Sequence, residues 1–134
     1  IFRFVGNDIG GDTGSIGIKR PDMVESYTFG KIKIDGKEYT SDVIAYKDRV
    51  DDEWIRQDGH FLRAEDIAEA IKAKPKIIVV GTGNAGQMAV SDGLKQELKN
   101  LGIGLAVLPT EQAFREYNEL SLEKDVIGVF HLTC

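Results

Sequence analysis

The amino-acid sequence predicts an α/β fold in three layers, with a mixed sheet whose parallel β-α-β-α-β core follows an antiparallel β-hairpin layer. The first observation is an alternation of polar and apolar residues around an Asp-Gly pair at 35–36, which is typical of a hairpin. The second is a change to helical spacing of the apolar residues after residue 62. The third is the alternation of helices and apolar strands from there onward, because successive β-α-β units imply parallel strands joined by right-handed crossovers.

Residues 1–22 have a composition of their own. Five glycines stand among Asn, Asp, Thr and Ser in this segment. No basic region precedes a long apolar stretch, so the segment lacks the pattern of a signal peptide. We expect an N-terminal extension without a function of its own, in which Ile1–Val5 and Ser15–Lys19 can pair as short strands. We expect residues 23–134 to form a single α/β domain.

The antiparallel layer is predicted from residue 26 to residue 57. Ser26–Phe29 and Lys31–Ile34 have the sequences of strands, and Lys37–Thr40 returns as their partner. The Asp-Gly pair between the last two favours a two-residue turn with positive φ at both positions. Val43–Tyr46 is predicted as a further strand, and a second Asp-Gly pair at 58–59 marks another turn.

Helices and parallel strands are predicted in the second half of the chain. The expected helices are Ala64–Lys74, a helix from Ser91 to Asn100, and Glu111–Leu120. Ser91 and Thr110 stand in N-cap positions, where a hydroxyl can accept from a free N–H of the first turn. The expected strands are Lys76–Val80, Ile103–Leu108 and Val126–Thr133.

The composition excludes several classes of function. Hydrophobic residues make up 42% of the chain and charged residues 29%, the profile of a globular protein rather than a disordered one. The net charge of −5 argues against a nucleic-acid binder and against binding to an anionic membrane. No apolar run is long enough to span a membrane. A single cysteine cannot form an internal disulfide, which favours a reducing compartment such as the cytoplasm.

The segment Gly81–Gly86 has the spacing G-x-G-x-x-G directly after an apolar strand, the pattern of a dinucleotide-binding turn. A helix should open at the last glycine, yet four residues intervene before Ser91, the better helix cap. The ribose-binding acid should stand about 20 residues further on, at the end of the next strand, and Glu111 comes too late. We therefore expect a glycine-rich turn that shapes a crevice, and no cofactor.

This crevice is the candidate ligand site, because ligands of open α/β sheets bind beyond the carboxyl ends of the parallel strands. Free backbone N–H groups there could hold a small anion. The candidate ligand-binding residues are Thr82, Gly83, Asn84, Gly86, Pro109, Thr110 and His131.

The sequence lends little support to catalysis. His131 is a weak candidate acid or base, and a histidine on an apolar strand is more often a hydrogen-bonded core residue. His131 and Cys134 are three positions apart, so on one strand they point to opposite faces. An approach of His60 to either residue stays open. The two histidines and the cysteine lack zinc-binding spacing, and we expect no metal site.

Trp54 and Arg56 are the candidate interaction residues, because tryptophan and arginine are enriched at the energetic centres of protein interfaces. The alternative is that Trp54 packs the antiparallel layer onto the sheet while Arg56 remains solvated.

A set of short motifs is spread along the chain in a characteristic order. They are the run Tyr27–Tyr39 with its Asp-Gly turn, Asp42-Val43-Ile44, Gly59-His60, Gly81-Thr82-Gly83, Leu108-Pro109-Thr110 and His131–Cys134. Together these motifs resemble a small family, that of the adipogenesis-associated domain protein and mitochondrial complex I assembly factor three. The resemblance covers residues 25–134 and implies an α/β domain with a mixed sheet. It implies no catalytic residues, and it implies that the animal members are assembly or interaction proteins.

Two functions follow as hypotheses. The first is a non-catalytic binding or assembly module that has an unidentified protein partner or associates with itself. The second is a small-molecule-binding protein or enzyme whose site is the crevice of the glycine loop, with an anionic or nucleotide-like ligand and His131 as acid or base.

Overall fold

A five-stranded mixed sheet forms the middle layer of the protein, whose computed structural model describes residues 23–56 and 58–134. The strands are β4 (Val43–Ala45), β5 (Val50–Asp51), β7 (Ile77–Thr82), β9 (Gly104–Leu108) and β10 (Val126–His131). Their order is β5-β4-β10-β7-β9. β10, β7 and β9 are parallel to one another, and β4 is antiparallel to β10. The predicted parallel core of three strands is therefore confirmed.

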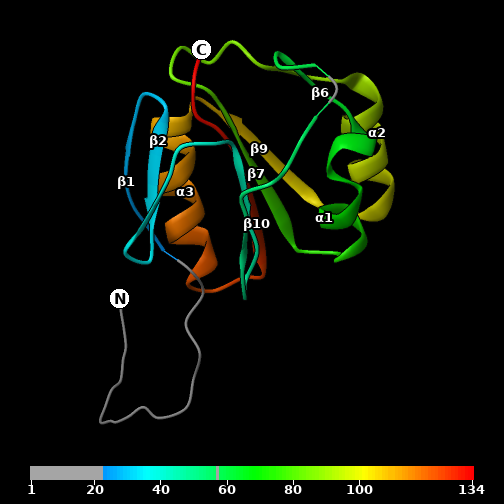
Figure 1. Cartoon of the computed structure of the whole chain (residues 1–134). Coiled ribbons are helices and arrows are strands. Elements are labelled where there is room, and N and C mark those ends of the chain that lie inside the picture. The colour runs from blue at the N-terminus through cyan, green and yellow to red at the C-terminus, as the bar shows by residue number, and fades with distance from the viewer. Residues whose placement is uncertain (1–22, 57) are drawn as a thin grey trace, which may run out of the picture.

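The predicted hairpin layer is present beside α3 (Thr110–Ser121) on one face of this sheet (Figure 1). It consists of β1 (Val24–Thr28), β2 (Lys31–Ile34) and β3 (Lys37–Tyr39), paired antiparallel in sequence order. Asp35 and Gly36 both have positive φ, 50° and 82°, as the two-residue turn between β2 and β3 requires. A buried cluster that includes Ile32, Val79, Tyr117 and Phe130 joins the hairpin layer, α3 and the sheet.

The opposite face of the sheet is covered by α1 (Ala68–Lys72) and α2 (Asp92–Leu101) (Figure 1). A second buried cluster, which includes Leu62, Val80, Leu94 and Val129, fills this side. A short parallel ladder of β6 (Phe61–Leu62) with β8 (Ala89–Val90) lies here as well. The observed layers are thus α1 and α2, the central sheet, and α3 with the hairpin sheet, and the predicted three-layer α/β fold with a mixed sheet is confirmed.

Not every predicted element has the expected form. The helix expected over 64–74 begins as the 3-10 turn Ala64–Ile67 and becomes α-helical only at Ala68. Ser91 caps α2 as expected, since its Oγ accepts from Leu94 N at 3.0 Å. Thr110 does not cap α3: the N-cap position is Pro109, and the Thr110 hydroxyl bonds to neighbouring strands. The predicted N-terminal extension lies outside the described residues.

Candidate functional site

The C-terminal ends of the parallel strands bring several predicted site residues together. Thr110 Oγ1 donates to the carbonyl of His131 at 2.5 Å and accepts from Gly83 N at 2.9 Å. Thr82 Oγ1 donates to the carbonyl of Leu108 at 3.1 Å. These bonds join the ends of β7, β9 and β10 to the start of α3. The Thr110 hydroxyl therefore joins the ends of β7 and β10 to the start of α3 instead of capping its own helix.

Most of the N–H groups that were expected to be free for anion binding at the glycine loop are bonded within the protein. Gly83 N bonds to Thr110, Asn84 N to the carbonyl of Thr133, and Gly86 N to the carbonyl of Gly83. Thr110 N bonds to the carbonyl of Gly83. Because these four donors are engaged within the protein, they are not free to bind a carboxylate or phosphate in this structure.

Gly83 is required where the chain after β10 passes over this loop. Its φ is +106°, and a Cβ there would overlap the carbonyl oxygen of Thr133. The same Cβ would lie 2.9 Å from His131 Cδ2 and 3.1 Å from the carbonyl carbon of Cys134. The glycine thus lets the last residues of the chain and the ring of His131 approach the backbone of the loop.

His131 belongs to a largely buried polar network with Asp42 and Arg56. Arg56 Nη1 lies 2.5 Å and His131 Nδ1 2.7 Å from Asp42 Oδ2, and Leu132 N donates to Asp42 Oδ1 at 2.9 Å. The second Arg56 nitrogen donates to the carbonyl of Gly59 at 2.6 Å. The exposed fractions of the three side chains are 7% for Arg56, 18% for Asp42 and 6% for His131.

The charge of Asp42 determines the hydrogen-bond pattern of the network. Burial on its own raises the pKa of this carboxyl, but the bonds from His131, Arg56 and Leu132 N outweigh that effect and lower the pKa to about 2. An ionised Asp42 only accepts, so His131 Nδ1 carries the proton and donates it. Arg56 is only a donor, so its 2.8 Å approach to the same nitrogen is a contact and not a second hydrogen bond. In the neutral ring, Nε2 is then an acceptor, and it is buried without a partner among residues 23–56 and 58–134.

His60 approaches the end of the chain, the possibility that the sequence left open. Its Nε2 lies 3.0 Å from Cys134 Sγ. Its ring stands at 89° to that of His131, with the ring centroids 6.4 Å apart. β10 ends at His131, so the strand alternation that would separate His131 from Cys134 does not extend to the cysteine. Within the described part of the chain, no three His, Cys, Asp or Glu side chains are arranged to hold a metal.

The predicted interaction pair is only partly accessible. Arg56 is buried against Asp42, so the alternative of a solvated Arg56 is wrong. Trp54 is half-buried against the cluster beneath α1 and α2, and its Nε1 donates to the carbonyl of Asp66 at 2.8 Å. Ile55, between them, has 86% of its surface exposed.

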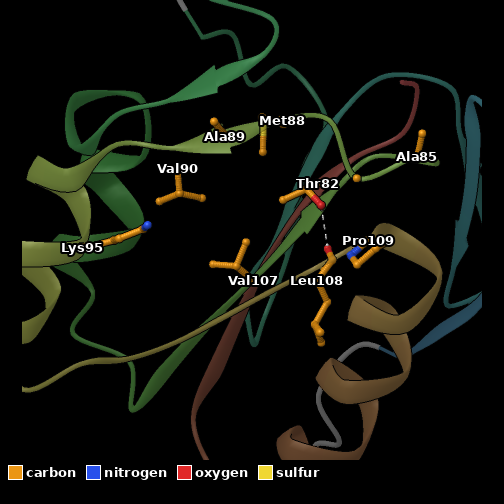
Figure 2. Close-up of a pocket in the computed structure, with 10 residues that line it drawn as sticks. Thr82, Ala85, Met88, Ala89, Val90, Lys95, Val107, Leu108 and Pro109 are labelled. Atoms are coloured by element: carbon orange, nitrogen blue, oxygen red, sulfur yellow. Dashed lines mark hydrogen bonds between the residues drawn. The ribbon is translucent and has the colours of Figure 1, made fainter.

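A groove of about 480 Å³ opens between β8, α2 and the end of β9 (Figure 2). Three of the predicted ligand residues line it, namely Thr82, Gly86 and Pro109. Most of the remaining lining is apolar, and the Lys95 side chain points toward Val90 and Val107. Gly83, Asn84, Thr110 and His131 do not line the groove.

β9 forms one wall of this groove and one edge of the central sheet. Among the residues that the structure describes it is paired with β7 alone, and its sequence, Gly-Leu-Ala-Val-Leu, contains no charged residue. Val107 is 41% exposed. An edge strand without charge, proline or cover presents free backbone donors and acceptors to another chain. The strand at the opposite edge, β5, is two residues long and stands among charged residues.

The fold and the site define a small α/β domain with a mixed sheet, an apolar edge strand and a polar cluster at its strand ends. The chain belongs to the family described as protein of unknown function (DUF498/DUF598), whose model matches residues 24–131. No helix among the described residues is long and apolar enough to cross a membrane.

Solved structures of several other proteins have the same fold. The conserved hypothetical protein PH1505 from Pyrococcus horikoshii OT3 is 25% identical, with a TM-score of 0.71 over 83% of this chain and 98% of that one. XCC1710 from Xanthomonas campestris is 20% identical, with a TM-score of 0.73 over 83% and 84% of the two chains. A Mth938-like domain protein from Bordetella pertussis is 18% identical, with a TM-score of 0.62 over 89% and 90%.

Proposed function

We propose that this domain is a non-catalytic interaction module that binds an extended segment of a partner protein along β9. The observation that carries the proposal is the apolar edge of the central sheet, where Val107 is 41% exposed. A partner strand would complete the hydrogen bonds of this edge, and alternate side chains of the partner would enter the adjoining groove.

The other sheet edges are less suitable for such pairing. β5 is short and stands among charged residues, and β3 has the sequence Lys-Glu-Tyr. At β1, Asn118 of α3 accepts from Val24 N at 2.9 Å and donates to the carbonyl of Val24 at 2.7 Å. Charged residues and covering contacts such as the Asn118 bonds protect an edge strand from pairing with another chain, and the part of the chain that the structure describes shows neither at β9.

Charge favours a partner protein over a second copy of this chain. The net charge of −5 makes two copies repel each other. The one cation that lines the groove is Lys95, and none of the ion pairs in the described residues uses it. The partner segment should therefore combine apolar residues at alternate positions with an acidic residue that reaches Lys95.

The sequence motifs support an assembly role. We infer that the chain is related to the adipogenesis-associated domain protein and to mitochondrial complex I assembly factor three. The resemblance of its motifs to that family implies a role in assembly or interaction. The single cysteine fits a reducing compartment, and we place the protein in the cytoplasm.

Selection from a displayed library of random peptides tests the proposal. We expect selected peptides to have alternating apolar residues and an acidic residue, and their affinity should fall at least tenfold in Val107→Lys, since burying an unpaired ammonium in the groove is costly. Leu122→Lys is the matched control, because Leu122 is 55% exposed at the end of α3. Peptides that bind Val107→Lys as tightly as wild type, or self-association through β9 without peptide selection, would overturn the proposal.

A small anionic ligand in the same groove is the second candidate, favoured by the ammonium of Lys95 beside Thr82, Gly86 and Pro109. Native mass spectrometry of the purified protein tests it. A retained small molecule that is lost in Lys95→Glu would support this candidate. A protein that carries no bound mass, before and after incubation with inorganic phosphate, would oppose it.

A further inference from the structure

The Cys134 thiol lies where a proton acceptor can reach it. His60 Nε2 is 3.0 Å from Sγ, and the backbone N–H of His60 is bonded to Asp58 Oδ1 at 2.9 Å, which fixes the turn that carries the histidine. Cys134 is half-buried and His60 is exposed, so a small reagent can reach the pair from solvent. A thiol beside a histidine in a partly exposed position is the usual environment of a reactive cysteine.

A second observation points to a ligand at the same place. The ring of His131 is buried, and its Nε2 has no hydrogen-bond partner among the described residues. Cδ2, the neighbour of Nε2 in the ring, and the carbonyl carbon of Cys134 both lie about 3 Å from the position of a Cβ on Gly83. The His131 ring also lies 6.4 Å, centroid to centroid, from the ring of His60, so its unpaired nitrogen belongs to the same cluster as the thiol, while the other ring nitrogen is fixed by Asp42. An unpaired acceptor in this position suits a ligand that carries an N–H or O–H group.

From these observations we propose that Cys134 is a site of thiol–disulfide exchange with low-molecular-weight disulfides that carry such a donor. His60 Nε2 takes the proton from Sγ, and the thiolate attacks one sulfur of the disulfide. A new S–S bond forms at Cys134 as the old one breaks, and the leaving thiolate receives the proton from His60. The exchange uses no further oxidant or reductant. Because the chain has one cysteine, the product is a stable mixed disulfide and not an internal bridge.

This site is separate from the proposed β9 surface, since neither His60 nor Cys134 lines the groove. The two proposals can therefore fail independently.

The experiment measures the rate at which glutathione disulfide modifies the protein near neutral pH, followed by intact mass. Ordinary thiols are only a few per cent ionised at about pH 7, so we expect the folded protein to react about tenfold faster than the same chain unfolded in urea. Cys134→Ser should not react, which assigns the modification to the only thiol of the chain.

His60→Ala separates proton transfer from a structural effect. Its rate should fall to that of the unfolded chain, and added imidazole should restore much of the loss, because free imidazole can replace a missing base but not a missing structural contact. Thermal unfolding of the variant should match wild type, since His60 is exposed. A folded rate no faster than the unfolded rate, or a His60→Ala rate equal to wild type, would overturn the proposal.

Discussion

Among individual residues, Asp42 connects the most distant parts of the candidate site. It stands just before β4 and accepts hydrogen bonds from Arg56, His131 and Leu132 N. One carboxylate thus links the end of β10 to the loop that carries Arg56. Removing it leaves the arginine charge buried without its counter-ion, which is the costly way to disrupt a buried ion pair.

Asp42→Asn tests this role. We expect the substitution to lower the free energy of unfolding by about 3 kcal/mol, measured by urea denaturation near neutral pH. Glu111→Gln is the control, because Glu111 also pairs with an arginine, Arg115, but both side chains are more than half exposed. The control should lose less than about 0.5 kcal/mol. Equal losses in the two variants would contradict the assigned importance of the buried network.

The pH dependence of stability follows from the same carboxylate. Its pKa falls from the ordinary value of 3.8 to about 2 on folding, so the unfolded chain binds the proton more readily. The stabilisation, about 2 kcal/mol, is complete above about pH 4 and is lost as the pH falls from about 4 to 2. Subtracting the stability curve of Asp42→Asn from that of wild type should reveal this loss. A difference that stays constant over this range would contradict it.

At the scale of elements, local signals were enough for some features and not for others. The turn at Asp35-Gly36 and the cap at Ser91 depend on residues within three positions of each other, and both were predicted. The Thr110 hydroxyl has the same local signal as Ser91, but its partners are Gly83 and His131, which are distant in sequence. Its role as a bridge between strand ends therefore could not be predicted from its neighbours.

The candidate site shows the same limit. Sequence reasoning placed the strand ends at a common edge, and Thr82, Gly86 and Pro109 do line a groove there. It missed Asp42 as the partner of Arg56, and it treated Arg56 as a surface residue. Arg56 and Asp42 are 14 positions apart and share neither a helix nor a strand, so no periodic pattern relates them and their ion pair could not be predicted from the sequence. Lys95 was missed because one lysine on a helix is ordinarily only a solvated residue.

Two glycines, one in the loop after β7 and one in α2, should affect the free energy of unfolding in opposite directions when each is replaced by alanine. Gly83→Ala should destabilise the protein by more than about 2 kcal/mol, because φ is +106° and the added carbon meets backbone atoms. Gly93→Ala, in α2, should stabilise the protein by about 0.5–1 kcal/mol, because the added carbon meets no described atom within 4 Å apart from its chain neighbours and its own helix backbone. Thermal and urea unfolding of both variants give the signs. A neutral Gly83→Ala would mean that the end of the chain does not cross the loop as described.

For the whole molecule, the position of each strand in the sheet determines how its backbone is protected. β7 and β10 are central strands, paired on both sides and covered by a buried cluster on each face. Within the described part of the chain, β9 is paired on one side only. Because amide exchange in a central strand requires extensive unfolding, β7 and β10 should exchange most slowly, and the β9 amides that do not bond to β7 should exchange fast.

Hydrogen exchange can therefore locate a partner without knowledge of its identity. A peptide selected on the wild-type protein should slow exchange at the unpaired amides of β9 and leave the hairpin layer unchanged, because strand addition satisfies these backbone groups directly. Val107→Lys should show no such protection at the same peptide concentration, while Leu122→Lys should show all of it. Protection that appears at α3 or at the Ile55 loop instead of β9 would move the interaction surface to that element.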